Sequence, residues 1–287
     1  MDLFVYGLIN AACLVMIAVG FSLVYGVSRV ANFAHGAVYI LTGFVVWTFL
    51  NKAGLNYSLT FIFSLVITAL IGFGIYQGFL IRVRGMPASE IISSFAVGLG
   101  IIELLKVIGF VGVYGNRVFF RGSVTIAGVP VDCQRLIGVG TAVAVTLFLF
   151  YFTHYTKIGL ALRGIAQDEP AAMMLGIDSD LVASLSLALG SALAALAAII
   201  LLPLGNIYPG IGYDALLYAV AVCIVGGLGS LTGTVIASLL LAYAQVLCIR
   251  LLGGQWQMVA IFLAILLILI FKPSGLLGRQ KELEERV

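Results

Sequence analysis

The stretch Phe4–Val27, FVYGLINAACLVMIAVGFSLVYGV, decides the fold class because it contains no charged side chain. A helix of this length can cross the hydrocarbon core of a bilayer, which needs about 20 predominantly apolar residues. The run is continuous rather than alternating, which favours helices over an outer-membrane barrel. It lacks a basic leader and a small-residue cleavage site, so we interpret it as a retained membrane span.

The rest of the chain has the same character. Of its 287 residues 62% are hydrophobic and only 9% are charged, and the mean hydropathy is +1.19. Soluble domains carry about 25% charged residues, so a soluble globular enzyme is excluded. We predict one all-α polytopic membrane domain over residues 1–287, with about nine spans and a range of about eight to ten. The spans are placed near Phe4–Val27, Phe33–Leu50, Tyr57–Leu80, Ile91–Val113, Arg135–Phe152, Leu181–Pro203, Gly212–Leu228, Leu231–Leu252 and Trp256–Phe271.

The distribution of basic residues orients these spans. Nine spans put the two termini on opposite sides, and basic residues favour cytoplasmic loops. A cytoplasmic C-terminus leaves Lys106 inside a span and divides the other basic residues nine to five in favour of the inside. We therefore predict that the N-terminus is outside and the C-terminus is cytoplasmic. The inner set is Arg29, Arg82, Arg84, Lys157, Arg163, Lys272, Arg279, Lys281 and Arg286, and the outer set is Lys52, Arg117, Arg121, Arg135 and Arg250.

Two loops and a tail lie between and after the spans. The outer loop Tyr114–Gln134 is rich in glycine, which predicts turns or a short hairpin. The inner loop, 153–180, is the most polar stretch before the charged tail at 272–287, which we expect to be cytoplasmic. No loop is large enough for a catalytic domain, so we expect no catalytic residue. The cysteines and histidines indicate no disulfide framework and no metal site, and no basic cluster indicates nucleic-acid binding.

A weak internal repeat divides the chain. Spans one to four (about 1–113) and six to nine (about 181–271) point in opposite directions around a central span (about 135–152). In each half the first span leads through a glycine-punctuated polar stretch, 26–36 or 205–214, into a short span that we expect to be discontinuous or re-entrant. Inverted repeats with broken helices are typical of transporters, and substrate sites lie at the repeat interface. We predict two inverted-topology repeats.

Six residues at these two breaks are candidates for a translocation pathway. Within each break, residues three or four apart share a helix face, so they can line a pathway together. The alternative is that Asn32 and Asp214 cap helices, because a polar or acidic group is favoured at a helix N-terminus. The candidates are Asn32, Phe33, His35, Gly36, Asp214 and Tyr218.

Two other features of the spans have less specific interpretations. Glu103 and Lys106 are predicted to lie mid-span, where ionisable groups are costly and either neutralise each other or take part in transport. The glycine-rich stretch 226–233 resembles a phosphate loop but lacks the Lys-Ser or Lys-Thr that should follow, so we predict close helix packing there.

The inner loop contains the most specific local pattern. Asp168 is a good N-cap, Pro170 fits a first helical turn, and Gly176 suits the position after a helix. They predict a helix of about seven residues, or about 10 Å. It would expose Ala171, Ala172, Met173, Met174 and Leu175 outside the bilayer, and so large an apolar surface needs a partner. The alternative is that it lies on the bilayer, but it has no Lys or Arg to support that.

Several motifs together resemble the branched-chain amino acid ABC importer permeases of the LivH type. They are GFSLVYG at 20–26, NFAHG at 32–36, the pattern of the inner loop, and GGLGS at 226–230. The resemblance implies that the inner loop docks into an ATPase as a coupling element. The residues that match or flank this element are Gly159, Arg163, Ala166, Asp168, Ala171, Met174, Leu175, Gly176 and Ile177.

The same resemblance implies a fold, a set of partners and a location. The fold is that of the ribose and cobalamin importer permeases. The partners are a related LivM-type permease, two cytoplasmic ATPase subunits and an extracytoplasmic binding protein for branched-chain or related amino acids, in a bacterial inner membrane. This chain would itself hold no cofactor, because ATP and Mg bind in the ATPases. The alternative function is an ion-coupled carrier or facilitative channel that works alone, which needs no exposed coupling helix.

Overall fold

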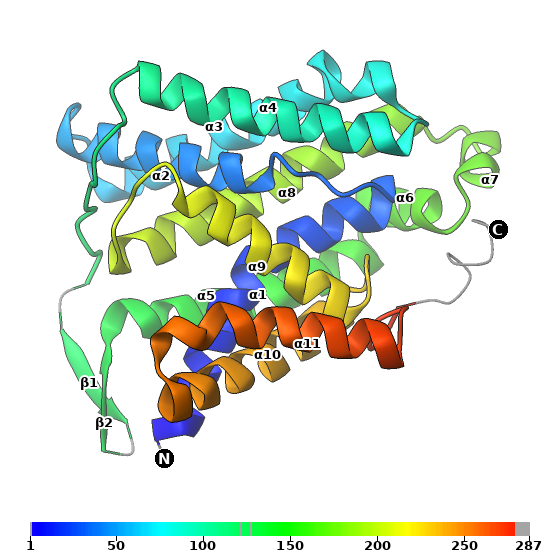
Figure 1. The fold of residues 1–287 in the computed structure, drawn as a ribbon. Coiled ribbons are helices and arrows are strands. Elements are labelled where there is room, and N and C mark those ends of the chain that lie inside the picture. Colours follow the sequence, from blue (N-terminus) through cyan, green and yellow to red (C-terminus); the bar gives the residue numbers. More distant parts are fainter. Residues whose placement is uncertain (1, 121, 127, 279–287) are drawn as a thin grey trace.

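The computed structural model describes residues 2–120, 122–126 and 128–278, and it is a bundle of helices with one small hairpin (Figure 1). Among the described residues, seven helices are long and apolar enough to cross a membrane. Two shorter apolar helices, α2 (His35–Asn51) and α9 (Ile211–Gly226), have 17 and 16 residues. The long helices are α1 (Asp2–Ser28), α3 (Tyr57–Gly78), α4 (Pro87–Val107), α5 (Cys133–Tyr155), α8 (Ser179–Leu201), α10 (Leu231–Leu252) and α11 (Gln257–Phe271), the last of which reaches 18 residues together with the 3-10 turn Gly254–Trp256 before it.

Each of the nine predicted runs forms one of these helices, with seven of spanning length and the second and seventh shorter. The fourth boundary was wrong, because α4 ends at Val107 rather than near Val113. Gly109 there has φ of 103°, a left-handed conformation that breaks the helix, and the chain continues to a single bridge between Tyr114 and Ile207. Consequently Glu103 and Lys106 lie in the last turn of α4 rather than mid-span.

The connecting segments hold more structure than the sequence predicted. The loop at 114–134 does form a hairpin, in which β1 (Ser123–Ile126) pairs antiparallel with β2 (Val129–Asp132). The loop at 153–180 contains the predicted helix, α7 (Glu169–Met174), and also an unpredicted amphipathic helix, α6 (Lys157–Gln167).

The beginning of the tail is packed rather than free. The backbone N–H groups of Leu276 and Leu277 donate to the carbonyls of Val225 and Gly226 at the end of α9. Residues 272–278 therefore fold back against the bundle, and the rest of the predicted tail, 279–287, lies outside the described residues.

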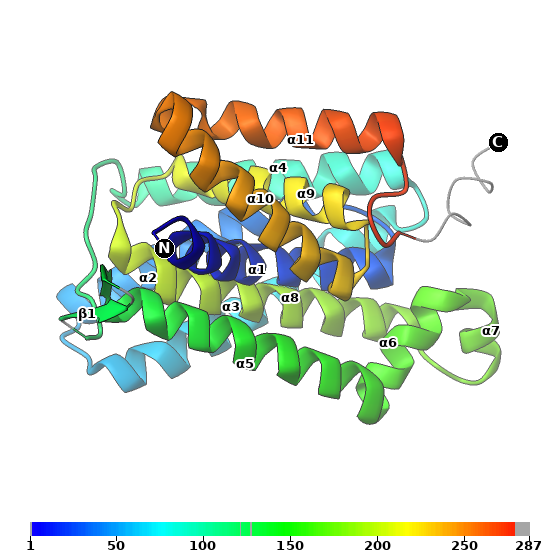
Figure 2. The same ribbon diagram turned by 90° about the horizontal axis from the view of Figure 1, so that it is seen from below.

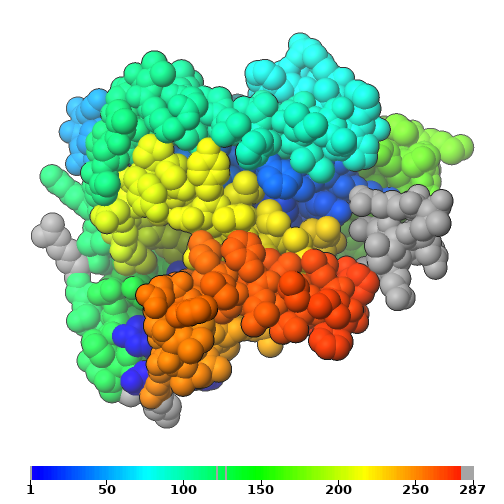
Figure 3. Space-filling view, in the orientation of Figure 1, coloured from blue at the N-terminus to red at the C-terminus, as the bar shows by residue number. Residues whose placement is uncertain are grey.

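Helix α1 forms the centre of the bundle. It packs against α8, α9 and α10, and 83% of its spanning window is buried, against 6% for α11. A helix that is apolar on every side is stable in such a position. Figure 2 shows α1 between α5 and α10, with α11 on the outside. Figure 3 shows α11 beside α9 on one face of the molecule.

Small and hydroxyl side chains bring the buried helices together. Helix α3 presents Thr60, Ser64, Thr68 and Gly72 at intervals of four residues, and Gly72 lies against Ser191 of α8. Such stripes allow close backbone approach in membranes, where packing rather than water drives association. Hydroxyl groups also connect helices, for example Thr42 with Thr68 at 3.0 Å.

The two ends of the bundle differ in character. We call the end that carries α6 and α7 the α7 end, and the end that carries β1 and β2 the hairpin end; they lie at opposite sides of Figure 1. At the α7 end, α5 turns into α6, and α7 leads into α8. The turn between α5 and α6 is tight, because a Cβ on Gly159 would lie 2.0 Å from the Phe152 carbonyl.

Candidate functional site

The first candidate site is the crossing of α2 and α9 in the middle of the bundle. A Cβ on Gly36 would lie 2.0 Å from the Gly212 carbonyl, and one on Gly212 would lie 2.7 Å from the Gly36 carbonyl. The two helix starts therefore touch backbone to backbone, which only glycine at these positions allows. The sequence placed Gly36 at a break in the first half, and the structure brings it against the corresponding break in the second half.

The turn before α2 is built by Asn32. Its Oδ1 accepts the backbone N–H of Ala34 at 3.1 Å, and the residue is 7% exposed. A local bond of this kind satisfies a donor at a helix start that would otherwise be free. The next residue, Phe33, donates its backbone N–H to Ser94 Oγ at 3.1 Å. Asn32 thus shapes the turn before α2, but the prediction that it caps the helix was wrong, because the N-cap is Ala34 and no side chain caps it.

His35 points to α1 rather than into the crossing. Its Nε2 lies 3.0 Å from the Ile17 carbonyl, and since a carbonyl only accepts, Nε2 is the donor. The Phe21 ring meets the imidazole edge-on at 5.8 Å, and His35 is 3% exposed. The structure therefore gives His35 a bonding role between α1 and α2.

Phe33 and Gly36 line a narrow hollow between α2, α4 and α9. Its volume is about 10 Å³, and Gly98 and Leu216 form other parts of its wall. The Phe33 ring meets that of Phe95 edge-on at 6.4 Å. A space of this size is about the minimum for one water molecule. The crossing is therefore closed in this conformation.

Asp214 and Tyr218 lie elsewhere on α9. Asp214 accepts the Tyr208 hydroxyl at 3.3 Å, and the Tyr218 hydroxyl accepts Gln257 Nε2, at the start of α11, at 3.4 Å. Neither lines the hollow that contains Phe33 and Gly36. The predicted pathway residues thus occupy four separate places rather than one surface, with Asn32 in the turn, His35 against α1, Phe33 and Gly36 at the hollow, and Asp214 and Tyr218 elsewhere on α9.

The ion pair at the end of α4 is not buried. Lys106 Nζ lies 2.6 Å from Glu103 Oε1, and the side chains are 41% and 60% exposed. The two groups therefore neutralise each other at the end of a helix, and a part in transport stays a prediction.

The second candidate site is α7 and its surroundings. The Asp168 carboxylate accepts the Ala171 backbone N–H at 3.0 Å, which confirms the predicted N-cap. Gly176 has φ of 81° just after the helix, as the sequence predicted. The most exposed apolar side chains are those of Met174, the last residue of α7, and Leu175 just after it, at 89% and 83%, whereas Met173 is 48% exposed.

One residue of the predicted apolar surface was placed wrongly. Ala172 is 4% exposed, because the inner side of α7 packs on α6 and α8 in a cluster with Leu162, Ile165 and Val182. Ile177 packs against the same cluster. The exposed apolar surface is therefore narrower than the sequence indicated, and it centres on Met174 and Leu175.

The remaining coupling candidates belong mainly to α6. The carbonyls of Ala166 and Gln167, at the end of α6, accept Arg29 Nη2 at 3.1 and 3.3 Å. A cation at a helix C-terminus is favourable because the last carbonyls have no partners within the helix. Arg163 lies on another side of α6 and lines a groove beside α5 and α10.

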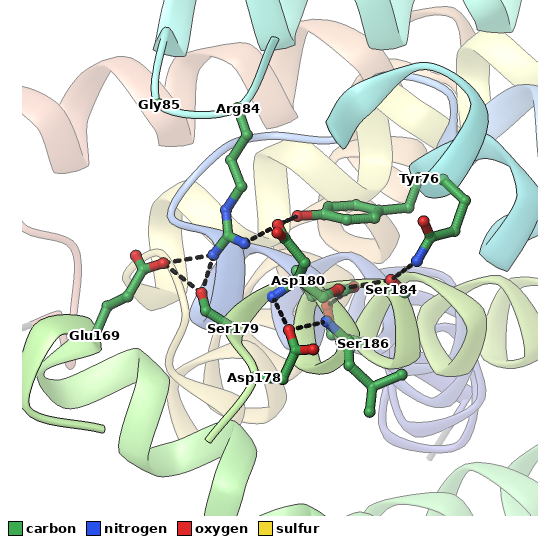
Figure 4. A network of polar contacts seen from close by, with 12 residues as sticks. Tyr76, Arg84, Gly85, Glu169, Asp178, Ser179, Asp180, Ser184 and Ser186 are labelled. Carbon is green, nitrogen blue, oxygen red and sulfur yellow. Dashed lines mark hydrogen bonds and ion pairs between the residues drawn. The ribbon is translucent and has the colours of Figure 1, made fainter. Parts of the chain in front are cut away.

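A polar network holds α7 to the membrane helices (Figure 4). Arg84, in the loop between α3 and α4, forms an ion pair with Glu169 of α7 at 2.5 Å and another with Asp180 of α8. It also donates to Ser179, which donates to Glu169. The Tyr76 hydroxyl of α3 donates to Asp180 at 3.1 Å. One guanidinium thus connects α7 with α8 and, through Asp180, with α3.

Burial lowers the pKa of the Arg84 guanidinium, but the hydrogen bond to Asp180 and the neighbouring acidic groups outweigh it, so the pKa lies above its usual value. The side chain therefore stays charged. It lines a cavity of about 930 Å³ at the α7 end, together with Arg29, Glu90, Met173 and residues at the start of α8. Movement of α7 would change the walls of this cavity.

The family model for the branched-chain amino acid transport system permease component matches residues 3–271. The chain belongs to this permease family.

Individual relatives of this permease cover nearly its whole length. It is 31% identical to the high-affinity branched-chain amino acid transport system permease protein BraD of Pseudomonas aeruginosa, over 96% of this chain and 94% of that one. It is 28% identical to LivH of Escherichia coli K12, over 92% and 91%. The autoinducer 2 import system permease protein LsrC of Yersinia pseudotuberculosis is 25% identical, over 91% and 74%.

A solved structure supports the fold of the permease. PsaBC from Streptococcus pneumoniae, in complex with Fab, aligns with a TM-score of 0.53 over 100% of this chain and 96% of that one. The sequence identity is 16%, so the similarity concerns the fold alone. Together with the apolar helices, the family identifies a multi-pass membrane transport protein.

Sequence reasoning missed the Arg84 network in this permease. Arg84 was counted only as an inside charge, and Glu169, Ser179 and Asp180 were treated as parts of a polar loop. The partners lie 85 to 96 positions from Arg84, so no local spacing connects them. One signal was available, namely an arginine and two acids that all belong to inner loops.

Proposed function

We propose that this chain is the permease subunit of an ATP-binding-cassette importer that moves branched-chain or related amino acids into the cell. Its relatives BraD and LivH are named for branched-chain amino acid transport, and LsrC for an import system. ATP hydrolysis would then reside in two partner ATPases. A second permease and an extracytoplasmic binding protein would complete the assembly in the inner membrane of a bacterium.

The observation that carries this proposal is the exposed surface of α7. Met174 and Leu175 are 89% and 83% exposed on a helix that is held firmly by Asp168 and Arg84. Burying a side chain of this type stabilises a contact by about 1.5–3 kcal/mol. A rigid, exposed apolar surface outside the spans suits the binding of a partner protein. A carrier that works alone does not need such a surface.

The Arg84 network would transmit the partner's movement. A displacement of α7 pulls on Glu169, and Arg84 passes this to Asp180 at the start of α8 and so to Tyr76 of α3. Helix α8 packs on α1, α2 and α3. A push at α7 would therefore reach the crossing of α2 and α9 through rigid helices.

The packing supports two inverted repeats. Helices α1 and α2 of the first half correspond to α8 and α9 of the second. Helix α1 packs on α10 and α8 packs on α3, and likewise α2 contacts α8 and α9 contacts α1. Where equivalent helices of the two halves cross, a glycine of one lies against a glycine of the other. Gly20 of α1 lies against Gly190 of α8, and Gly36 of α2 lies against Gly212 of α9. Exchanging α1–α4 with α8–α11 reproduces this set, as a two-fold axis in the membrane plane would.

In this arrangement α2 and α9 complete nine spans, with the N-terminus outside and the α7 end cytoplasmic. Phe33 and Gly36 would line the pathway where the repeats meet, and the closed hollow between α2, α4 and α9 would open during transport. Asp214 and Tyr218 would belong to its α11 side.

The test is copurification of the full chain from its native membrane, followed by substitution at α7. ATPase subunits should accompany the unaltered chain. Met174→Glu puts a charge into the contact, so binding of the ATPase should fall at least about tenfold, the equivalent of about 1.4 kcal/mol. ATP-driven uptake should be abolished, whereas the amount of chain in the membrane should not change.

Met86→Glu is the matched control. Met86 is 51% exposed at the same end of the bundle but belongs to the loop before α4. It should retain ATPase binding. Normal binding and uptake with Met174→Glu, or the absence of any ATPase from the native complex, would contradict the proposal and favour an ion-coupled carrier or channel.

A further inference from the structure

A second large hollow lies on the side of the bundle away from the Arg84 network. We call it the α5–α10 groove. Helices α5 and α10 form its walls, α1 forms its floor, and α6 closes it at the α7 end. Figure 2 shows α1 between these two walls. The groove has a volume of about 580 Å³, within the range of about 300–1,000 Å³ that is usual for ligand sites.

The groove lies at the edge of the bilayer. Its residues come from the later parts of α1 and α5 and the beginning of α10, so it occupies the half of the membrane nearest to α7. The last turns of α5 carry Tyr151 and Tyr155, which are 62% and 70% exposed. Aromatic residues of this kind gather where the membrane meets water. The α7 end of the groove is therefore at the depth of the lipid headgroups.

Helix α6 also has the character of an interfacial helix. Its inner side packs on the protein through Leu162 and Ile165. Its outer side leaves Ile158 46% and Leu160 53% exposed, and the basic residues Lys157 and Arg163 are also exposed. Exposed apolar side chains beside basic ones suit a helix that lies along the membrane surface. Arg163 thus stands beside the groove at the level where phosphate groups lie.

The charge in the groove has one sign. None of its lining residues is acidic, whereas Arg163 is among them. Within the described part of the chain, Arg163 makes no hydrogen bond or ion pair with another residue. The contrast with Arg84 is clear, because Arg84 is neutralised by two carboxylates. Arg163 is available to an anion from outside the chain.

Deeper in the groove the lining is mainly apolar, with Leu23, Leu149, Val235 and Ile236 below Arg163. The Ser22 and Thr146 hydroxyls at this depth are hydrogen-bonded within the protein. An occupant must therefore combine an anionic group at the membrane surface with an apolar part that extends into the bilayer. Basic pockets between membrane helices bind anionic lipid headgroups for this reason.

We propose that the α5–α10 groove is a binding site for an anionic phospholipid, with the phosphate at Arg163 and an acyl chain along Leu149, Val235 and Ile236. A bound lipid would fill the space between α5 and α10 and hold α6 against them. The site is separate from the exposed surface of α7, and it stands whether or not an ATPase docks there.

The experiment is native mass spectrometry of the full chain in detergent, titrated with phosphatidylglycerol or with phosphatidylcholine of the same acyl chains. One basic side chain near a membrane surface is worth about a fivefold gain in affinity for an anionic lipid. Phosphatidylglycerol should therefore bind about five times more tightly, and Arg163→Gln should remove this preference. Arg250→Gln is the matched control, because Arg250 is an exposed arginine at the other end of α10, and it should keep the preference.

A second pair of variants tests the apolar part. Ile236→Trp should fill the groove and reduce the binding of both lipids. Leu240→Trp adds the same side chain one turn further along α10, at a residue that is 54% exposed and does not line the groove, and it should leave binding unchanged. Both positions are exposed, so neither substitution disturbs the core.

Two outcomes would overturn the proposal. One is equal binding of the two lipids by the unaltered chain, or a preference that survives Arg163→Gln. The other is a protein occupant, which would be shown if a cysteine at position 236 crosslinks to a membrane helix of another subunit in the native complex.

Discussion

At the crossing of α2 and α9 two backbones touch at Gly36 and Gly212 with no side chain between them, whereas at the α7 end helices are joined by long charged side chains beside a cavity of about 930 Å³. The crossing has almost no free volume, and any added atom must displace backbone. The α7 end has room to move, and its bonds can be exchanged with water. The first region therefore sets the stability of the permease, and the second is suited to transmit motion.

The largest effect is expected at the crossing. In Gly36→Val the new side chain collides with the Gly212 carbonyl, and overpacking costs about 1–3 kcal/mol or more. We expect the free energy of unfolding to fall by an amount at the upper end of that range, because the atoms in the way belong to the backbone and cannot move aside. The measurement is heating in detergent followed by size-exclusion chromatography. Gly100→Val in α4, where a Cβ meets nothing within 4 Å, should leave the midpoint nearly unchanged. Equal behaviour of the two variants would show that α2 and α9 are not in contact.

A smaller effect is expected next to the crossing. His35→Ala removes the hydrogen bond to the Ile17 carbonyl and the contact with Phe21. We expect the free energy of unfolding to fall by about 2 kcal/mol, which is at the low end for large-to-small changes in a core. Uptake and thermal stability should fall together. His35→Gln keeps a donor and should recover part of both. If His35→Ala lost uptake at full stability, the residue would belong to the pathway instead.

The smallest effect on stability is expected at the α7 end. Arg84 is 25% exposed and its partners are 42% and 49% exposed, so its ion pairs are partly screened, and Arg84→Ala should cost about 1 kcal/mol. ATPase binding should persist, because Met174 and Leu175 are unchanged, but uptake should fall about tenfold if about 1.4 kcal/mol of coupling is lost. Arg82→Ala removes an inside charge from the same loop and serves as the control. Full uptake with Arg84→Ala would remove the network from the transmission route.

The apolar runs predicted the helices well because a membrane leaves the backbone few alternatives. Helix α7 was predicted from local chemistry, namely the cap at Asp168 and the turn at Gly176. Helix α6 was missed although Ile158, Leu162 and Ile165 recur at helical spacing, so the signal was present in the sequence.

Other features were beyond sequence reasoning for physical reasons. His35 binds a backbone carbonyl, and the identity of Ile17 does not reveal that an acceptor is there. Ala172 was predicted to be exposed because the helix that covers it, α6, had been overlooked. The candidate pathway residues were grouped by their positions at two chain breaks, but side-chain direction, which depends on the neighbouring helices, separates them into four groups.

The central position of α1 has a consequence for how this protein is made. Helix α1 is made before the other described helices, but its main neighbours α8, α9 and α10 come much later in the chain. It can enter the bilayer alone, since its backbone bonds are satisfied internally and its surface is apolar. Until the last helices arrive, its glycine-bearing faces contact lipid rather than protein. A chain interrupted after α7 would be inserted with its central helix in place but without α8, α9 and α10, so cellular quality control would meet a central helix whose main partners are missing.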